Sequence, residues 1–185
     1  MRVGLVSDTH VQDDLKGMPP EICEVFRRYG VELILHAGDI DSPRVLDVLE
    51  QVAPVLAVRD FTEPSRGDPR LEETYRVTEV EGKKIGLVHD ISWPGARVNA
   101  DDGLQFPDMP LTEVLTSKFG QAVDIVVYGH THEELVLIRD GVWFVNPGST
   151  AAPGLRHRLG ELGTIGILEI SPEGSISVEI VKLGT

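Results

Sequence analysis

Residues 3–10 read Val3-Gly4-Leu5-Val6-Ser7-Asp8-Thr9-His10, an apolar run that passes directly into polar residues. Four apolar residues in succession, followed by polar ones, predict a short strand buried in a parallel sheet. Asp8 and His10 come at the carboxyl end of this strand, which is where open α/β sheets bind their ligands. The segment therefore predicts both the class of fold and the location of a site.

Strands and helices alternate through the residues that follow. A helix is predicted over 19–29, because Pro19-Pro20 can open it and its apolar residues share one face. A second strand is predicted over 33–37, and Ser42-Pro43 predicts the N-cap and first-turn proline of a second helix. A third strand is predicted over 54–58. This β-α-β-α-β order implies right-handed crossovers and a largely parallel sheet.

The second half of the chain is richer in strands. We expect a hairpin that turns at Gly82, a helix over 111–119, and further strands joined by glycine-containing turns. The predicted strands span 75–80, 85–88, 125–128, 135–138, 142–145, 164–170 and 175–181. Residues 91–110 are predicted as a long irregular loop at the rim of a functional site. The whole pattern predicts an α/β fold of two stacked sheets flanked by helices, in a single domain over residues 1–185.

The composition narrows the class of protein. Lys and Arg number 17 against 30 Asp and Glu, a net charge of −13, so we expect no binding to long nucleic acids or to anionic membranes. The single cysteine, Cys23, excludes an internal disulfide and fits a reducing compartment. No apolar run approaches the roughly 18 residues of a membrane span, and the N-terminal run is too short for a signal peptide. We expect a cytoplasmic protein, with a homodimer as the default oligomer.

Potential metal ligands recur at the ends of the predicted strands. His130 and His132 follow one strand, and Gly129 lets the backbone turn so that both imidazoles face one crevice. The full set is Asp8, His10, Asp39, His89, His130 and His132. Carboxylate and imidazole ligands suit Mn²⁺, Fe, Zn²⁺ or Ni²⁺, whereas Ca²⁺ requires more oxygen ligands. The set exceeds the three ligands of an ordinary catalytic zinc, so it favours two ions that share a carboxylate.

Each of these residues also has an ordinary structural explanation. Asp8 and Asp39 can cap turns, and His89 can be a hydrogen-bonded core residue. The metal hypothesis is favoured because four of the six histidines and two carboxylates fall at strand ends together. His36, inside an apolar run, is interpreted instead as a hydrogen-bonded core residue. Asn146-Pro147-Gly148-Ser149 is predicted to be a structural turn that adjoins the site.

Five motifs in order resemble the calcineurin-like metallophosphoesterase superfamily, and most closely its small bacterial and archaeal phosphodiesterase branch. They are Asp8-Thr9-His10, Gly38-Asp39, His89, Gly129-His130-Thr131-His132 and Asn146-Pro147-Gly148-Ser149. The resemblance implies a four-layer α/β/β/α sandwich of two mixed sheets. It also implies a first metal held by Asp8, His10, Asp39 and His132. Asp39 would bridge to a second metal held by His89 and His130.

The resemblance further implies an activity. A dinuclear centre of two divalent ions, with Mn²⁺ expected first, would activate a hydroxide that hydrolyses a small phosphodiester or phosphomonoester. Asp39, His89 and His130 would be the catalytic residues. The alternative is a non-catalytic protein of the same fold that serves as an interaction scaffold, as one eukaryotic trafficking subunit of the family does.

The chain departs from the family pattern after its third strand. The family has a Gly-Asn pair there, and the Asn binds the second metal and the substrate phosphate, whereas this chain has Val58-Arg59-Asp60-Phe61-Thr62-Glu63. The Phe61 side chain cannot bind a metal, so we expect Asp60 to replace the Asn, with Glu63 as the other candidate. This departure motivates the scaffold alternative.

Other residues near the motifs are candidates for smaller roles. Asp90 stands where the family usually has Gly, and it can be an extra ligand or a partner that fixes an imidazole tautomer. Arg156, in a short basic run, is a candidate for binding substrate phosphate, although a solvated surface run explains it equally well. Trp93 and Phe106 are interpreted as residues that pin the loop 91–110 to the core.

Overall fold

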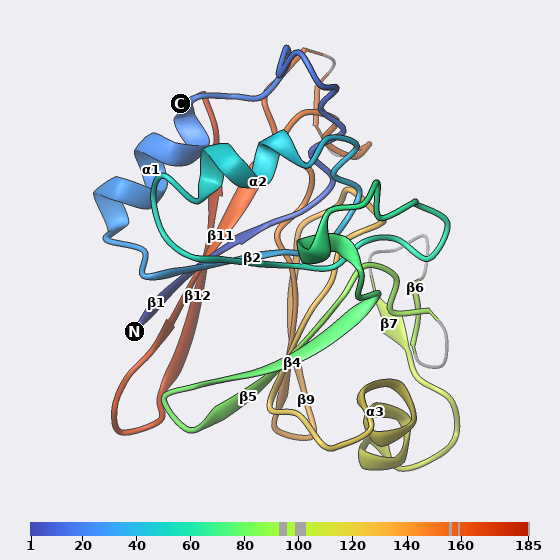
Figure 1. Cartoon of the computed structure of the whole chain (residues 1–185). Coiled ribbons are helices and arrows are strands. Elements are labelled where there is room, and N and C mark those ends of the chain that lie inside the picture. The colour runs from blue at the N-terminus through green and yellow to red at the C-terminus, as the bar shows by residue number, and fades with distance from the viewer. Residues whose placement is uncertain (93–95, 99–102, 156, 159, 185) are drawn as a thin grey trace.

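The protein folds into two stacked β-sheets with helices on both outer faces (Figure 1). The structure is a computed structural model that describes residues 1–92, 96–98, 103–155, 157–158 and 160–184. All structural statements below refer to these residues. The four-layer α/β/β/α sandwich predicted from the sequence is confirmed.

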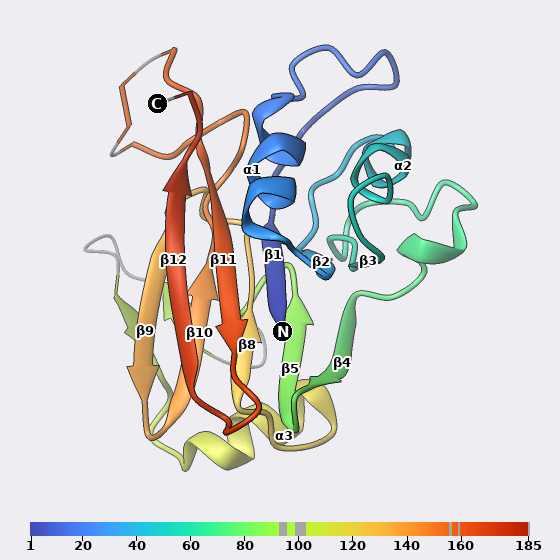
Figure 2. The same ribbon diagram turned by 90° about the vertical axis from the view of Figure 1, so that its left-hand side faces the viewer.

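The first sheet has the strand order β12-β11-β1-β2-β3. Its strands are β1 (Arg2–Val6), β2 (Leu33–His36), β3 (Val55–Ala57), β11 (Thr164–Ile170) and β12 (Ile176–Lys182). β1, β2 and β3 run parallel, while β11 pairs antiparallel with both β1 and β12. The helices α1 (Glu21–Tyr29) and α2 (Arg44–Leu49) lie beside this sheet (Figure 2).

The second sheet has the strand order β4-β5-β8-β10-β9. Its strands are β4 (Tyr75–Val80), β5 (Lys83–Val88), β8 (Ile125–Val127), β9 (Leu135–Arg139) and β10 (Val142–Asn146). β5, β8 and β10 run parallel, and the antiparallel strands β4 and β9 form the edges. The helix α3 (Leu111–Phe119) packs with this sheet on the side of the molecule away from α1 and α2 (Figure 1).

Buried apolar side chains fill each space between the layers. Along β1, Val3 and Leu5 face the second sheet, and Val6 faces the helices, because successive side chains of a strand point to opposite faces. A Cβ on Gly4 would lie 2.8 Å from the Phe26 ring, so the glycine permits α1 to pack closely on β1. A third apolar cluster joins α3 to the outer face of the second sheet.

The structure corrects two details of the prediction. Residues 91–110 are not wholly irregular, because β6 (Arg97–Val98) and β7 (Leu104–Gln105) form a small antiparallel ribbon. Strands of two residues are too short to show an alternating pattern in sequence. The N-cap of α2 is Pro43 rather than Ser42, whose hydroxyl instead accepts the Arg44 N–H at 3.3 Å. A short 3-10 helix, η1 (Pro69–Leu71), precedes β4.

The two sheets bring their parallel strands to one edge of the molecule. Asp8 and His10 follow β1, and Asp39 follows β2 in the first sheet. His89 follows β5, and the 130–132 loop follows β8 in the second sheet. Because both sheets contribute strand ends here, the candidate site lies between them. In the described part of the chain, no helix combines the length and apolar character needed to cross a bilayer.

Candidate metal centre

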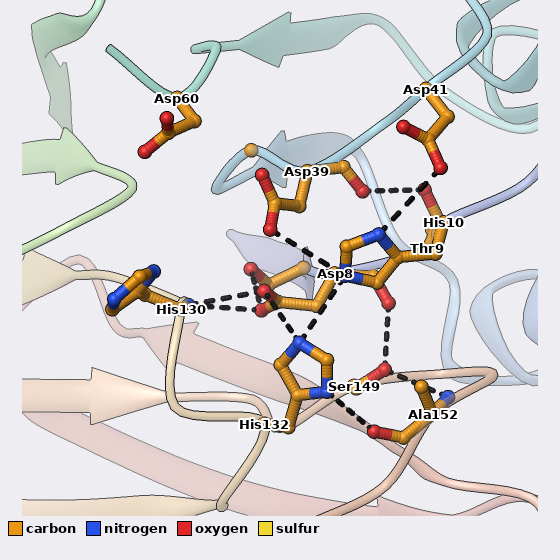
Figure 3. A network of polar contacts seen from close by, with 12 residues as sticks. Asp8, Thr9, His10, Asp39, Asp41, Asp60, His130, His132, Ser149 and Ala152 are labelled. Carbon is orange, nitrogen blue, oxygen red and sulfur yellow. Dashed lines mark hydrogen bonds and ion pairs between the residues drawn. The ribbon is translucent and has the colours of Figure 1, made fainter. Parts of the chain in front are cut away.

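The structure gathers the predicted ligands into two groups. The first cluster contains Asp8, His10, Asp39 and His132, and the second cluster contains Asp60, His89 and His130. Within each cluster, one ligand atom from every residue lies within 4.8 Å of the others. In Figure 3 the side chains of the first cluster converge around Asp8 and Asp39. The six residues of the predicted ligand set and Asp60 therefore lie in two compact donor groups, whereas Glu63 and Asp90 lie in neither.

One carboxylate oxygen faces both clusters. Asp39 Oδ2 lies 3.5 Å from His10 Nε2 in the first cluster and 3.4 Å from His89 Nε2 in the second. The first cluster is closed by His132 Nε2, which lies 3.2 Å from His10 Nε2 and 3.4 Å from Asp8 Oδ1. In the second cluster, Asp60 Oδ2 lies 3.8 Å from His89 Nε2. Asp39 therefore has the position required of a ligand shared by two cations.

Backbone carbonyls orient two of the imidazoles. His89 Nδ1 lies 2.7 Å from the Ala37 carbonyl, and His132 Nδ1 lies 2.6 Å from the Ala152 carbonyl. A carbonyl only accepts hydrogen bonds, so each Nδ1 carries a hydrogen, and in the neutral form of each ring Nε2 presents a lone pair to its cluster. His89 Nε2 is buried and makes no hydrogen bond. A buried nitrogen lone pair without a donor is what a metal ligand requires, so the donor set fits a divalent cation.

The backbone at the site adopts an unusual conformation. Five of the seven candidate ligand residues, all in the described part of the chain, have a positive φ: Asp8, His10, Asp39, His130 and His132. A positive φ is uncommon for residues other than glycine, and such strain concentrates at functional sites. The sharp turns it creates direct side chains i and i+2 toward the same place, as Asp8 and His10 show. Strand alternation alone would not predict these turns.

Two glycines allow the strand ends to approach one another. A Cβ on Gly129 would lie 1.8 Å from Ser7 Oγ and 2.6 Å from Asp8 Oδ2. Gly38 has φ +95°, and a Cβ there would lie 2.7 Å from the His89 ring. Any larger residue at either position would push a ligand of the clusters away.

The predicted turn 146–149 holds the ligand loops in place. Asn146 Nδ2 donates to the Gly129 carbonyl at 2.9 Å and to Thr131 Oγ1 at 3.0 Å. Ser149 Oγ donates to the Asp8 carbonyl at 2.6 Å. Both side chains are fully buried. The turn thus ties the end of β1 to the 130–132 loop.

The negative charge of the site changes the protonation of its residues. Burial raises the pKa of Asp8. Burial also lowers the pKa of His89, but the carboxylates of Asp39 and Asp8 outweigh it and raise the pKa to about 9. Although burial raises the pKa of Asp39, its histidine neighbours bring it below the ordinary value. The same field that favours a second proton on His89, at Nε2, would attract a divalent cation, which would take that proton's place.

The loop after β3 shows which carboxylate faces the second cluster. Asp60 belongs to the cluster, whereas the Glu63 carboxylate accepts the N–H groups of Asp41 at 3.4 Å and Asp60 at 3.2 Å. Glu63 therefore links the loop after β2 to the loop after β3, and both of its carboxylate oxygens already accept hydrogen bonds. The Phe61 side chain is 84% exposed. Asp60 remains the candidate replacement for the family's Asn.

Several sequence candidates lie outside the two clusters. Asp90 accepts hydrogen bonds from the N–H and the hydroxyl of Ser92, at 2.7 and 2.6 Å, so it stabilises its own loop. The side chain of His157, next to the candidate Arg156, is 2% exposed and lies 2.9 Å from the Glu134 carboxylate. Arg156 and Trp93 lie outside the described residues. Phe106 packs edge-on against Phe144 with ring centroids 5.0 Å apart, as expected of a residue that pins its loop.

Sequence reasoning missed the partner of His10. Asp41 Oδ2 lies 3.6 Å from His10 Nδ1, and Asp41 also has a positive φ. This carboxylate can orient the His10 ring as the carbonyls orient His89 and His132. Its position two residues after Asp39, in the same sharp turn, is the signal that was available in the sequence.

Comparison with known proteins agrees with this geometry. Residues 1–173 match the calcineurin-like phosphoesterase superfamily domain. The chain is 31% identical over 186 residues to a probable metallophosphoesterase of Methanothermobacter thermautotrophicus, a match that covers 100% of this chain and 94% of the relative.

Solved structures share the fold over nearly the whole chain. The crystal structure of Vps29 of Entamoeba histolytica, complexed with Zn²⁺, has a TM-score of 0.64 at 23% identity and covers 98% of this chain and 99% of that one. An archaeal phosphodiesterase has the same TM-score and identity, with 98% and 100% covered. The motif order, the sandwich fold and the family match agree: the chain belongs to the calcineurin-like phosphoesterase superfamily.

Proposed function

We propose that the protein is a metal-dependent phosphoesterase that hydrolyses a small phosphodiester or phosphomonoester at a dinuclear centre. The observation that carries the proposal is the position of Asp39 Oδ2, within 3.5 Å of a histidine nitrogen in each cluster. A shared carboxylate places two cations close enough to act on one phosphoryl group. Family membership supports the same reaction class.

Each cluster supplies a distinct part of the centre. Asp8, His10, Asp39 and His132 would hold the first ion, and Asp39, Asp60, His89 and His130 would hold the second. Bound divalent cations supply Lewis acidity that polarises the phosphoryl group and makes water more acidic. The chain has a net charge of −13, so it would bind phosphate through this local positive charge rather than through its surface.

The catalytic residues in this proposal are Asp39, His89 and His130. Asp39 fixes the spacing of the two clusters. The Ala37 carbonyl fixes the His89 ring at 2.7 Å and directs Nε2 to the cluster. His130 is the exposed member of the second cluster and can reach an oxygen of the substrate. Arg156 remains a proposed phosphate-binding residue on sequence grounds alone.

Asp60 changes the charge of the second half of the site. A carboxylate binds a divalent cation more strongly than the Asn of the family pattern, but it repels a phosphate oxygen. Mn²⁺ is the ion we expect, and Fe, Zn²⁺ and Ni²⁺ suit the same ligands. We therefore expect the second ion to be held firmly and to be the main attraction for the phosphate on this side.

Hydrolysis and metal content test the proposal together. The protein purified without chelator should contain two transition-metal ions per chain, and Mn²⁺ should support hydrolysis of bis(4-nitrophenyl) phosphate. Asp39→Asn should reduce both, and Asp60→Ala should leave one ion. Asp108→Asn, at an exposed carboxylate outside the clusters, is the matched control. If fully loaded protein shows no turnover with any divalent metal, the enzyme assignment is refuted.

A second function is a non-catalytic scaffold of the same fold. It is favoured by Phe61, which stands in the loop where the family pattern has its Asn and which exposes a large apolar ring. In this case the protein would bind one ion or none and act by contacting another protein. One ion or none per chain, with an intact fold, would support the scaffold over the enzyme.

A further inference from the structure

A cavity of about 720 Å³ adjoins the second cluster. Asp60, His89 and His130 line one side of it, so a ligand in the cavity would lie next to any cation held there. Phe61 and Tyr75 line the same cavity. Ligand pockets of this size usually combine apolar walls with a few polar groups that fix orientation.

The two aromatic side chains are unusually exposed. Phe61 is 84% exposed and Tyr75 is 45% exposed, which places both among the exposed large hydrophobic residues of the described chain. Single exposed apolar residues need no explanation, but two aromatic rings at one cavity beside a candidate metal site do.

The fold places these rings beside the ligands by local connections. Phe61 follows Asp60 directly, and Tyr75 pairs across the strands with Val88, the residue before His89. The Arg59 N–H donates to the Glu73 carbonyl at 3.0 Å, which ties the Phe61 loop to the start of β4. Phe61 is therefore adjacent to one residue of the second cluster, and Tyr75 pairs with the neighbour of another.

The Tyr75 ring also packs against a buried aromatic side chain. Its ring contacts Phe119 edge to face, with centroids 6.2 Å apart and an interplanar angle of 67°. Phe119, the last residue of α3, is buried against β5, where a Cβ on Gly86 would lie 2.7 Å from its ring. A ring fixed in this way loses little conformational freedom when a ligand stacks on it.

Some of the charged side chains that line the cavity offset one another. Lys118 and Asp90 both line it and interact electrostatically, so that the Lys118 cation compensates the Asp90 carboxylate. Lys118 is only 8% exposed, so this compensation takes place where water screens it weakly. Arg59 lines the cavity as well, so cationic side chains offset part of the acidic charge beside the two aromatic rings.

We propose that this cavity is a subsite for a planar aromatic ring, aryl or nucleobase, on the alcohol of the phosphate ester. Phe61 and Tyr75 contact the ring while the phosphate lies at the second cluster. The inference rests on the proposed function, because the cations bind the phosphate. The two side chains determine specificity and take no part in the chemical step.

Binding of non-hydrolysable phosphinates to the Mn²⁺-loaded protein tests the subsite. Diphenylphosphinate and dimethylphosphinate carry the same anion, but only the first has rings. By calorimetry, the diphenyl compound should bind about tenfold more tightly or better, because stacking on two rings contributes on this scale. Adenosine 5′-monophosphate against ribose 5-phosphate makes the same comparison for a nucleobase.

Variants locate the effect. Phe61→Leu and Tyr75→Leu retain apolar bulk without a ring, and each should reduce the aromatic preference several-fold while dimethylphosphinate binding is unchanged. Because Phe61 is on the surface, Phe61→Leu keeps the test open if Tyr75→Leu does not fold. Ile138→Ala, at a side chain 53% exposed on β9, is the control.

The outcomes separate the subsite from the proposed function. The subsite is supported if the protein prefers the aromatic compound of either pair and the Leu variants remove that preference. The pair that shows the preference identifies the ring as aryl or nucleobase. Equal binding of the aromatic and non-aromatic compounds in both pairs overturns the subsite and leaves the enzyme proposal intact. If the Mn²⁺-loaded protein binds none of the phosphinates and phosphates, the proposed function on which the subsite rests is overturned.

Discussion

Replacing His36 with Gln should remove the contribution of this buried imidazole to destabilisation by mild acid. His36 is fully buried at the end of β2, three residues before Asp39. Its Nδ1 accepts the Gly38 N–H at 3.2 Å, and its Nε2 lies 3.3 Å from Thr9 Oγ1. The neutral ring therefore has its hydrogen on Nε2, and a second proton on Nδ1 would face an N–H donor.

The structure gives the size and sign of the effect. Burial lowers the pKa of His36 from 6.5 to about 3. Below pH 6.5 the unfolded chain binds a proton that the folded chain does not, so the unfolding free energy falls as the pH falls toward 3. At pH 5 the difference from neutral pH is about 1.5 pH units at 1.36 kcal/mol each, or about 2 kcal/mol. Above pH 6.5 His36 contributes no pH dependence.

Urea denaturation of the wild type and His36→Gln between pH 8 and pH 5 measures this contribution. Chelator is included so that metal binding does not add to the stability. The Gln amide can still donate to Thr9 but does not titrate. The variant loses the packing of the buried ring, so we expect it to be less stable than the wild type at pH 8. The gap between the two proteins should then shrink by about 2 kcal/mol at pH 5. Parallel curves over this range would refute the assignment of a buried neutral His36.

Three further changes probe the supports of the site. Asp41→Ala leaves His10 Nδ1 without its carboxylate and should weaken Mn²⁺ binding by about 10- to 100-fold in a titration; unchanged affinity would exclude an orienting role. Asn146→Ala removes three hydrogen bonds of a buried side chain and should lower the unfolding free energy in urea by roughly 2–4 kcal/mol, and a loss within experimental error would contradict it. Gly129→Ala places a methyl group 1.8 Å from Ser7 Oγ, so elemental analysis should find fewer ions per chain, and a wild-type count would show that the loop adjusts without cost.

The order of the elements could be predicted because the relevant signals are local. The strand β11 and the helix α3 have the predicted limits, 164–170 and 111–119, since each is a continuous apolar or amphipathic segment with clear ends. The ribbon of β6 and β7 could not be predicted, because two-residue strands have no period. The N-cap of α2 was displaced by one residue, which is the ordinary uncertainty at a helix end.

The candidate ligands were found for a similar reason. A side chain that follows a buried parallel strand must lie at the carboxyl edge of the sheet, so Asp8, Asp39 and His89 could be named from their positions. The choice between Asp60 and Glu63 could not be made in this way. Both carboxylates belong to one loop, and the hydrogen bonds that occupy Glu63 come from the backbone of two separate loops.

The sequence by itself determined the fold class, the family and most of the candidate metal ligands. These follow from apolar runs and from the residues at their ends, which are properties of short segments. Only the tertiary structure decided which residues form each cluster, that Asp39 faces both, and that carbonyls 52 and 20 residues away orient His89 and His132. It also joined Phe61 and Tyr75 in one cavity. These relations depend on packing two sheets face to face, and packing joins residues that no local pattern connects.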